Sequence, residues 1–279
     1  MTDSKRTIIR VTHPGSDDPV YLARRQEIEK ITSSYQKDSL IPLVKYREEE
    51  EKTWSIIAKK MVGLHKGRVC TRYMKGKDAL KLPLQRIPQL QDLDERLKKL
   101  RGFRVVPVEG WADSRSFFER LSERKMFCTQ YIRHASQPEY TPEPDIVHEV
   151  IGHLPMFALD DDFTAFTQLI GWAGAVASPE EMIQLERLYW FTSEFGLIKE
   201  KEGVRIYGAS PAGSVGEIQN CLTDKVERKP FQLEEVLDTN YDIYGFQKKF
   251  FVIDSFKQLF EETEPYLRSI IDKKRGLPV

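Results

Sequence analysis

The segment from Thr141 to Pro155, with the sequence TPEPDIVHEVIGHLP, constrains the local fold more than any other stretch of this chain. Its first two prolines favour an extended approach, because proline fixes its own φ angle and disfavours helix in the preceding residue. The mostly apolar residues 146–151 predict a short helix that starts near Asp145. Gly152 and Pro155 predict that this helix ends there.

Two of the five histidines, His148 and His153, lie in this segment. On a regular α-helix an offset of five residues corresponds to about 500°, so the two side chains would diverge by about 140°. They can meet at one metal ion only if the helix ends between them. The offset also departs from the H-E-x-x-H pattern of zinc peptidases, in which both histidines share one helical face. From the spacing alone, a metal site and a structural role are equal alternatives.

A carboxylate lies within an aromatic run further along the chain: Glu194 in residues 188–197, LYWFTSEFGL. An unpaired glutamate is costly to bury, and binding to a metal is one way to offset that cost. An ion pair or an exposed position at a helix edge is the alternative. Two imidazoles and one carboxylate with open positions form the facial triad of non-haem Fe(II) oxygenases. His148, His153 and Glu194 are therefore candidate iron ligands.

The composition narrows the class of protein. The 279 residues include 43 basic and 43 acidic side chains, so no net charge attracts nucleic acid or an anionic membrane. The 3 cysteines are widely spaced and form no CxxC pair, which is typical of a reduced intracellular protein. No signal peptide or membrane-spanning segment is predicted. We expect a cytoplasmic protein without nucleic-acid or membrane partners.

Apolar periodicity predicts a mainly α fold with short β-strands in a single domain. The segments that predict helices are residues 20–35, 48–62, 87–100, 113–124, 146–151, 161–177 and 179–195. The segments that predict strands are residues 103–108, 127–132 and 204–207. Residues 65–85 and the Gly/Ser/Pro stretch after residue 207 are expected to be loops, and residues 1–16 a flexible arm.

Several blocks of the sequence resemble the pterin-dependent aromatic amino-acid hydroxylases. Residues 129–134 (TQYIRH), 140–155 and 188–197 are similar to the signature blocks of that family, and residues 18–25 and 49–54 match its early segments. The similarity runs from about residue 17 to residue 265. It implies the catalytic fold of the family over residues 17–279, without a regulatory or tetramerisation domain, and therefore a monomer.

The same resemblance implies hydroxylation of an aromatic ring by O2, with Fe(II) as the metal and a tetrahydropterin as the electron donor. Position by position it assigns the iron to His148, His153 and Glu194. It assigns the amino-acid substrate to Arg133, Thr141, Pro144, Asp145, Trp190 and Ile243. It assigns the pterin to Gly110, Ala112, Ser114, Phe117, Glu149 and Tyr189. Tyr73 matches a tyrosine on a mobile loop that closes over the site.

One stretch departs from the family pattern. In residues 207–214 (YGASPAGS), Gly213 stands where the family has a serine that supports an iron-ligating histidine. Loss of such support costs roughly 10–100-fold in metal affinity or activity, unless Ser214 or a water replaces it.

The substrate is expected to be phenylalanine, converted to tyrosine. Tyrosine hydroxylases resemble one another in having an aspartate where this chain has Ile243, and Trp190 is similar to the phenylalanine enzymes. Alternatives within the family are tryptophan hydroxylation and hydroxylation of phenylalanine at another ring position. Alternatives of another class are a zinc hydrolase that uses His148, Glu149 and His153, and a non-catalytic homologue that binds an amino acid.

Overall fold

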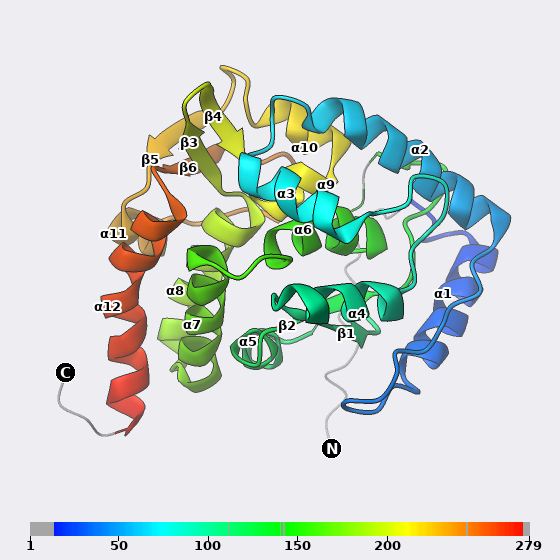
Figure 1. The fold of residues 1–279 in the computed structure, drawn as a ribbon, viewed down its shortest axis with the longest axis horizontal. Helices are drawn as coiled ribbons and strands as arrows, with labels where there is room; N and C mark the ends of the chain where they lie inside the picture. Colours follow the sequence, from blue (N-terminus) through cyan, green and yellow to red (C-terminus); the bar gives the residue numbers. More distant parts are fainter. Residues whose placement is uncertain (1–13, 111, 140, 142, 244, 276–279) are drawn as a thin grey trace.

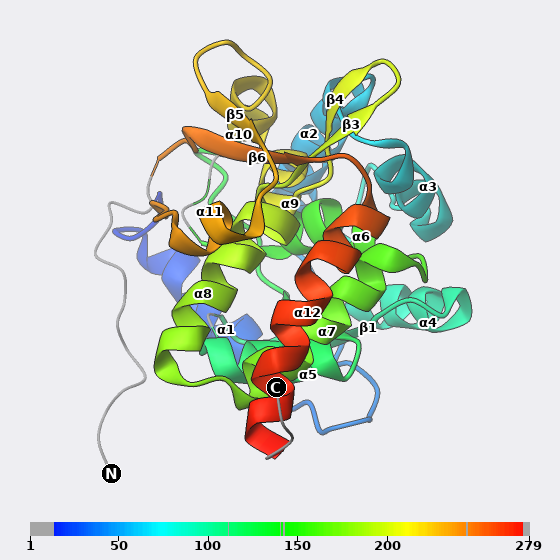
Figure 2. The same ribbon diagram turned by 90° about the vertical axis from the view of Figure 1, so that its left-hand side faces the viewer.

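The computed structural model describes residues 14–110, 112–139, 141, 143–243 and 245–275, and its helices surround two small sheets (Figures 1 and 2). The α-helices are α1 (Pro19–Thr32), α2 (Glu48–His65), α3 (Thr71–Leu80), α4 (Leu90–Leu100), α5 (Ser114–Ser122), α6 (Leu154–Phe157), α7 (Asp162–Val176), α8 (Pro179–Tyr189), α9 (Ala209–Gly213), α10 (Val215–Asn220), α11 (Leu233–Asp238) and α12 (Phe256–Arg275). Two π-helical turns, η1 (His148–His153) and η2 (Trp190–Glu194), join this set. The predicted mainly α fold is confirmed.

The strands form one parallel pair and one mixed sheet. Strand β1 (Arg104–Val108) pairs in parallel with β2 (Lys125–Thr129). The larger sheet has the order β4-β3-β6-β5, built from β3 (Leu197–Glu200), β4 (Gly203–Ile206), β5 (Glu227–Pro230) and β6 (Lys249–Ile253). Turn η1 packs against β2 and turn η2 against β6, so the two π-turns lie between the sheets.

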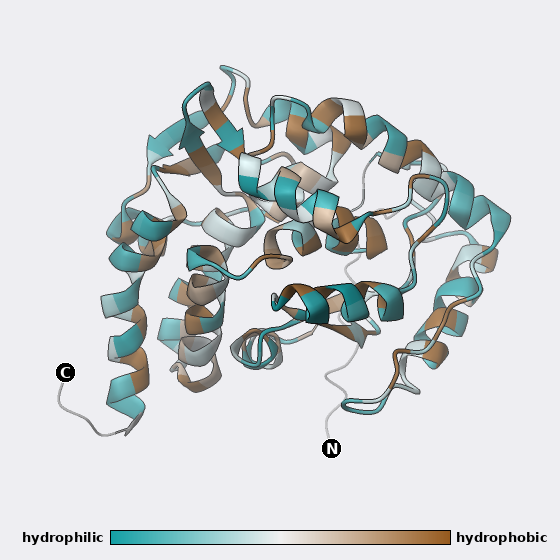
Figure 3. Ribbon diagram, viewed as in Figure 1, coloured by the Kyte–Doolittle hydropathy of each residue, from teal (hydrophilic) through white to brown (hydrophobic). Residues whose placement is uncertain are grey.

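Helix α7 is the centre of the helical layer and packs against both α5 and α12 (Figure 2). Gly174 allows close contact with α5, because a Cβ atom there would lie 2.4 Å from the Phe118 ring. Helix α12 buries Leu259 and Leu267 and carries hydrophilic turns on its other side (Figure 3). This packing fixes helix α5 and holds in place Ser114 and Phe117, two of the residues predicted to bind the pterin.

Two predicted loops are helices in the structure. Residues 71–80 form α3, which has a glycine and several charged residues but also an apolar side that buries Tyr73 and Leu80. Residues 209–213 form α9, although the glycine, serine and proline content of this stretch predicts a loop. Both helices depend on packing against the rest of the chain, which local composition does not reveal.

The predicted N-terminal arm, residues 1–16, lies largely outside the described residues, which begin at Pro14. The described end of the arm forms a turn with Gly15 at a φ of 92°, and Asp18 caps helix α1. Nowhere in the described ranges is a helix both long and apolar enough to cross a membrane.

Candidate active site

The two histidines converge because their helix changes to a wider π-turn. The backbone N–H of Leu154 donates to the carbonyl of Glu149, five residues earlier, instead of four. In such a turn, residues five apart lie on the same face. The ring centroids of His148 and His153 are 4.9 Å apart. The prediction that the helix ends between them is therefore wrong, since it continues into α6 and the π-turn itself brings the rings together.

Gly152 and Pro155 have other roles than ending the helix. A Cβ atom at Gly152 would lie 2.6 Å from the carbonyl oxygen of Ala209, so the glycine lets α9 approach η1. Pro155 has no N–H and leaves the Ile151 carbonyl without its usual helical donor. The hydroxyl of Tyr73 donates to that carbonyl instead, at 2.6 Å.

Tyr73 is fully buried in helix α3. The expectation that it belongs to a mobile loop over the site is therefore wrong. Its contact with the Ile151 carbonyl places it behind the π-turn, where it supports the backbone between the two histidines.

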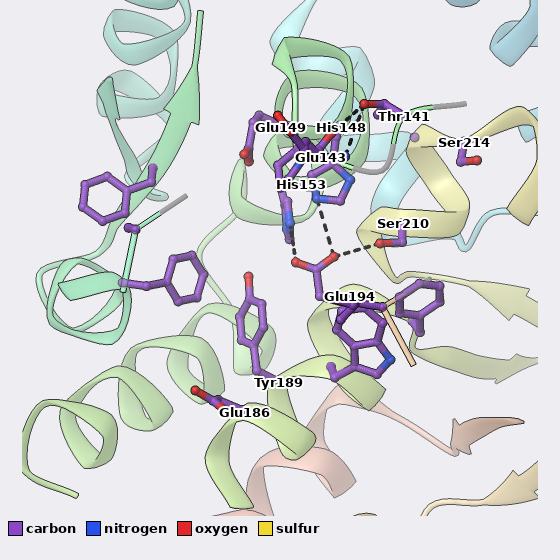
Figure 4. A pocket seen from close by; sticks show the side chains of 18 of the residues that line it. Thr141, Glu143, His148, Glu149, His153, Glu186, Tyr189, Glu194, Ser210 and Ser214 are labelled. Carbon is purple, nitrogen blue, oxygen red and sulfur yellow. Dashed lines mark hydrogen bonds and ion pairs between the residues drawn. The ribbon is translucent and has the colours of Figure 1, made fainter. Parts of the chain in front are cut away.

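The third candidate ligand comes from the second π-turn. The N–H of Phe195 donates to the carbonyl of Trp190 at 2.9 Å, again five residues earlier. This turn directs Glu194 toward both histidines (Figure 4). Its Oε1 lies 2.9 Å from Nε2 of His153, and its Oε2 lies 3.5 Å from Nε2 of His148. The predicted set of three ligands therefore converges around one point.

The electrostatics of this group suit a divalent metal. Burial alone would raise the pKa of Glu194, but the nearby His153 and His148 and hydrogen bonds from His153 and Ser210 lower it to about 2. Burial lowers the pKa of His148 to about 4, although Glu194 opposes this shift. A charged carboxylate and a neutral imidazole are the protonation states that bind metals.

A second carboxyl group lies close by. One ligand atom each of His148, Glu149 and His153 lie within 4.8 Å of one another. Burial, with Glu194 and Asp145 adding to it, raises the pKa of Glu149 well above its usual value. One of its carboxyl oxygens, Oε2, is buried without a hydrogen-bond partner. A protonated carboxyl is a poor metal ligand, so Glu194 is the better third ligand and Glu149 is left facing the cavity.

These groups open onto a cavity of about 360 Å³. Its lining includes every predicted site residue except Asp145 and Tyr73: Gly110, Ala112, Ser114, Phe117, Arg133, Thr141, Pro144, His148, Glu149, His153, Tyr189, Trp190, Glu194, Gly213, Ser214 and Ile243. These residues come from segments more than a hundred residues apart in the chain. The fold therefore assembles the predicted site into one space.

One end of the cavity carries a fixed positive charge. Arg133 lines it, while Asp145 lies fully buried behind the guanidinium and binds it through two hydrogen bonds. Thr141 and Pro144 lie on the same side, and the Thr141 hydroxyl donates to the carbonyl of Glu143. An anionic group of a ligand would be attracted to this end.

Aromatic rings form the other walls. Phe117 and Tyr189 meet edge to face, with centroids 5.0 Å apart. Trp190 stacks on Tyr241 at 4.3 Å. The hydroxyl of Tyr189 is buried and has no hydrogen-bond partner. Ile243 is 42% exposed and lies at the edge of the cavity.

Sequence reasoning missed several residues of this lining. They include Ser210, Glu143, Glu186, Tyr241 and Phe246. Glu186 accepts a hydrogen bond from the Ser114 hydroxyl, and its position three residues before Tyr189 on a helix was a usable signal. Ser210 carries no such signal, because the glycine, serine and proline content of its segment predicts a loop.

Comparison with known proteins agrees with this geometry. The sequence profile of the family described as "Biopterin-dependent aromatic amino acid hydroxylase" matches residues 4–276. The chain belongs to this family. The human phenylalanine-4-hydroxylase is 41% identical over 262 residues, which are 92% of this chain and 58% of that protein. The tyrosine 3-monooxygenase of Schistosoma mansoni is 39% identical over 265 residues, 94% of this chain and 57% of that protein.

A solved structure shows the same fold. Phenylalanine hydroxylase from Chromobacterium violaceum, with bound iron(III) and the oxidised cofactor 7,8-dihydrobiopterin, superposes with a TM-score of 0.78 at 34% identity. The match covers 87% of this chain and 92% of the bacterial chain. The predicted family and fold are thus confirmed. The chain spans less than three fifths of the length of the two curated relatives.

Proposed function

We propose that this member of the family hydroxylates the ring of L-phenylalanine to L-tyrosine, with O2, Fe(II) and a tetrahydropterin. The observation that carries the proposal is the convergence of His148, His153 and Glu194 beside a cavity with one cationic end and aromatic walls. Two imidazoles and a carboxylate are the donor set of non-haem Fe(II) oxygenases. When bound, the iron would activate O2 while the pterin supplies two electrons.

The pterin side of the proposal rests on two polar atoms without partners. Oε2 of Glu149 and the hydroxyl of Tyr189 are both buried, unpaired and part of the cavity lining. Figure 4 shows both side chains on the opposite side of the Glu194 carboxylate from Ser214. Native proteins rarely leave such atoms unpaired, so they fit a ligand that brings its own donors and acceptors. The adjacent Phe117 ring offers a stacking surface for a flat heterocycle.

The substrate side rests on Arg133 and Trp190. Two of the guanidinium nitrogens of Arg133 bind Asp145, which leaves Nη1, 3.5 Å from the Pro138 carbonyl, to bind a substrate carboxylate. Trp190 is held by stacking on Tyr241 and lines the cavity as a flat apolar wall. The apolar Ile243 at the edge favours phenylalanine over a hydroxylated ring, because it offers no partner for a phenol.

One assay tests the reaction and the substrate. Purified protein receives Fe(II), a tetrahydropterin, O2 and either Phe, Trp or Tyr, and the position of the new hydroxyl is determined. We expect tyrosine from phenylalanine as the main product. His148→Ala and Glu194→Ala should abolish product while circular dichroism remains unchanged. Full activity in either variant would contradict the iron assignment.

Two alternatives give different results in the same preparation. A zinc hydrolase would retain zinc after anaerobic purification and cleave a peptide or ester, with Glu149 as its base. A non-catalytic homologue would bind iron and phenylalanine without forming product. We also propose that residues 17–279 act as one catalytic domain and that the chain is a monomer, and size-exclusion chromatography with light scattering tests the latter.

A further inference from the structure

Ser210 makes a direct contact with the candidate iron site that the family pattern did not indicate. It lies in the first turn of α9 and is half-buried. Its Oγ donates a hydrogen bond of 2.9 Å to Oε2 of Glu194 (Figure 4). A hydroxyl that donates to a charged carboxylate forms one of the stronger hydrogen bonds in proteins.

This contact restrains the orientation of the carboxylate. The last side-chain torsion of a glutamate is broad, so the carboxylate plane rotates easily unless its oxygens are held. In this chain His153 contacts Oε1 of Glu194, and Ser210 binds Oε2. A metal ion bound by His148, His153 and Glu194 would replace the contacts between the histidines and the carboxylate, whereas the hydrogen bond from Ser210 could remain.

Neighbouring side chains do not duplicate this contact. Ser214 caps helix α10 by accepting from the Glu217 N–H. Ser193 precedes Glu194 directly, but its buried hydroxyl has no hydrogen-bond partner. Among the described residues, Ser210 is thus the one serine or threonine with a hydrogen bond to the Glu194 carboxylate.

The packing of α9 leaves little room for a side chain at position 213. A Cβ atom at Gly213 would lie 3.3 Å from Cα of Gly152 and 3.4 Å from Cα of His148. A side chain there fits only if α9 moves away from η1 by a few tenths of an ångström. The hydroxyl therefore comes from one turn earlier in α9 and reaches the carboxylate ligand.

We propose that Ser210 is a positioning residue of the iron site: its hydroxyl holds the Glu194 carboxylate in its ligating orientation and provides the outer support that Gly213 lacks. The inference rests on the proposed iron site. It assigns Ser210 a role in metal affinity and in the geometry of metal coordination. It also explains how this chain tolerates a glycine at position 213, where the family has a serine.

The test measures metal binding by the full chain without turnover. Co(II) serves as the probe, because it binds such sites and its visible absorption reports on coordination geometry. Ser210→Ala should weaken Co(II) affinity roughly 10–100-fold and change the absorption bands. Ser210→Thr, which keeps the hydroxyl, should restore both. Ser193→Ala is the matched control, since it removes an unpartnered hydroxyl beside the same ligand and should change neither.

The outcomes separate this inference from the proposed function. If the wild-type chain binds Co(II) and His148→Ala does not, the metal site stands. Wild-type affinity and spectrum in Ser210→Ala would then overturn the role of Ser210 alone. If Ser210→Ala does not fold, Ser210→Gly serves instead. Equal Co(II) binding by wild type and His148→Ala would overturn the iron site, and with it the role of Ser210.

Discussion

The guanidinium of Arg133 and the carboxylate of Asp145 form a two-point ion pair, with Nε–Oδ2 at 2.9 Å and Nη2–Oδ1 at 2.7 Å. Both side chains are buried. Asp145 also accepts from the backbone N–H groups of Arg133 and His148. One carboxylate thus fixes the cationic end of the cavity and the start of the metal-binding turn. Although burial alone would raise the pKa of Asp145, Arg133 and these hydrogen bonds lower it.

Asp145→Asn should therefore affect stability and substrate binding together. The substitution leaves the Arg133 charge buried without its partner, which typically costs about 3–5 kcal/mol of unfolding free energy. Chemical denaturation measures this loss, and the KM for the amino acid should rise. Glu261→Gln is the control, because its ion pair with Lys257 is exposed and worth at most about 1 kcal/mol. Equal losses of unfolding free energy in both variants would show that burial of the Arg133–Asp145 pair does not determine the effect.

Gly76 and Gly63 should respond in opposite directions to alanine. A Cβ atom at Gly76, in α3, would lie 1.8 Å from the Pro155 carbonyl oxygen, whereas one at Gly63, in α2, would meet nothing within 4 Å. Gly76→Ala should cost at least about 1–3 kcal/mol by overpacking. Gly63→Ala should stabilise by roughly 0.5–1 kcal/mol through helix propensity.

Because Pro155 follows His153 so closely, Gly76→Ala should also weaken Co(II) binding, whereas Gly63→Ala should not. Thermal melts and metal titrations of the two variants measure both effects. A destabilised Gly76→Ala protein with unchanged metal affinity would show that α3 does not hold the π-turn in place.

His65 gives the fold a specific pH dependence. Its ring is buried, with Nδ1 accepting from Lys77 and Nε2 donating to the Ala212 carbonyl. Burial and the Lys77 charge lower its pKa from 6.5 to about 3. Below pH 6.5 the unfolded chain therefore binds a proton that the folded chain excludes, and stability falls as the pH falls. Between pH 7 and pH 5 this contributes a loss of about 2 kcal/mol.

Comparison of the metal-free wild type with His65→Asn isolates this contribution. The variant is less stable at pH 7, because it lacks the imidazole contacts, but the difference in unfolding free energy should shrink toward pH 5. Urea denaturation at several pH values measures it. Parallel stability profiles would mean that His65 is protonated equally in the folded and unfolded states.

The sequence predicted the ligands better than the geometry that joins them. His148, His153 and Glu194 were found from residue type and family resemblance. The π-turns that unite them were not, because apolar periodicity distinguishes helix from strand and carries no signal for one wider turn. The role assigned to Gly152 failed for a related reason. Its small size serves the approach of Ala209, a contact from a segment nearly sixty residues away.

The helices α3 and α9 were missed because their stability comes from tertiary packing. Tyr73 is buried only because α3 packs against α6, and its partner is a carbonyl freed by Pro155. Ser210 acquires its role only because α9 also packs against η2, which carries Glu194. Neither relation is local in the chain, so no pattern in one segment predicts it.

Tyr189→Phe should stabilise the ligand-free protein and impair its use of the pterin. The Tyr189 hydroxyl is buried without a partner in the cavity, and removal of such a group avoids a desolvation cost of about 1–3 kcal/mol. If that hydroxyl binds the pterin, its loss should raise the KM for tetrahydropterin while Co(II) affinity stays unchanged. Thermal melts and steady-state kinetics measure the two effects.

Tyr207→Phe is the matched control. Its hydroxyl is also buried without a partner, but Tyr207 does not line the cavity. It should gain similar stability with no change in the KM for the pterin. A rise in that KM in Tyr189→Phe alone would indicate that its unpaired hydroxyl is retained for the cofactor. If both variants keep the wild-type KM, Tyr189 acts only as a packed ring against Phe117, and the assignment of its hydroxyl to the pterin is wrong.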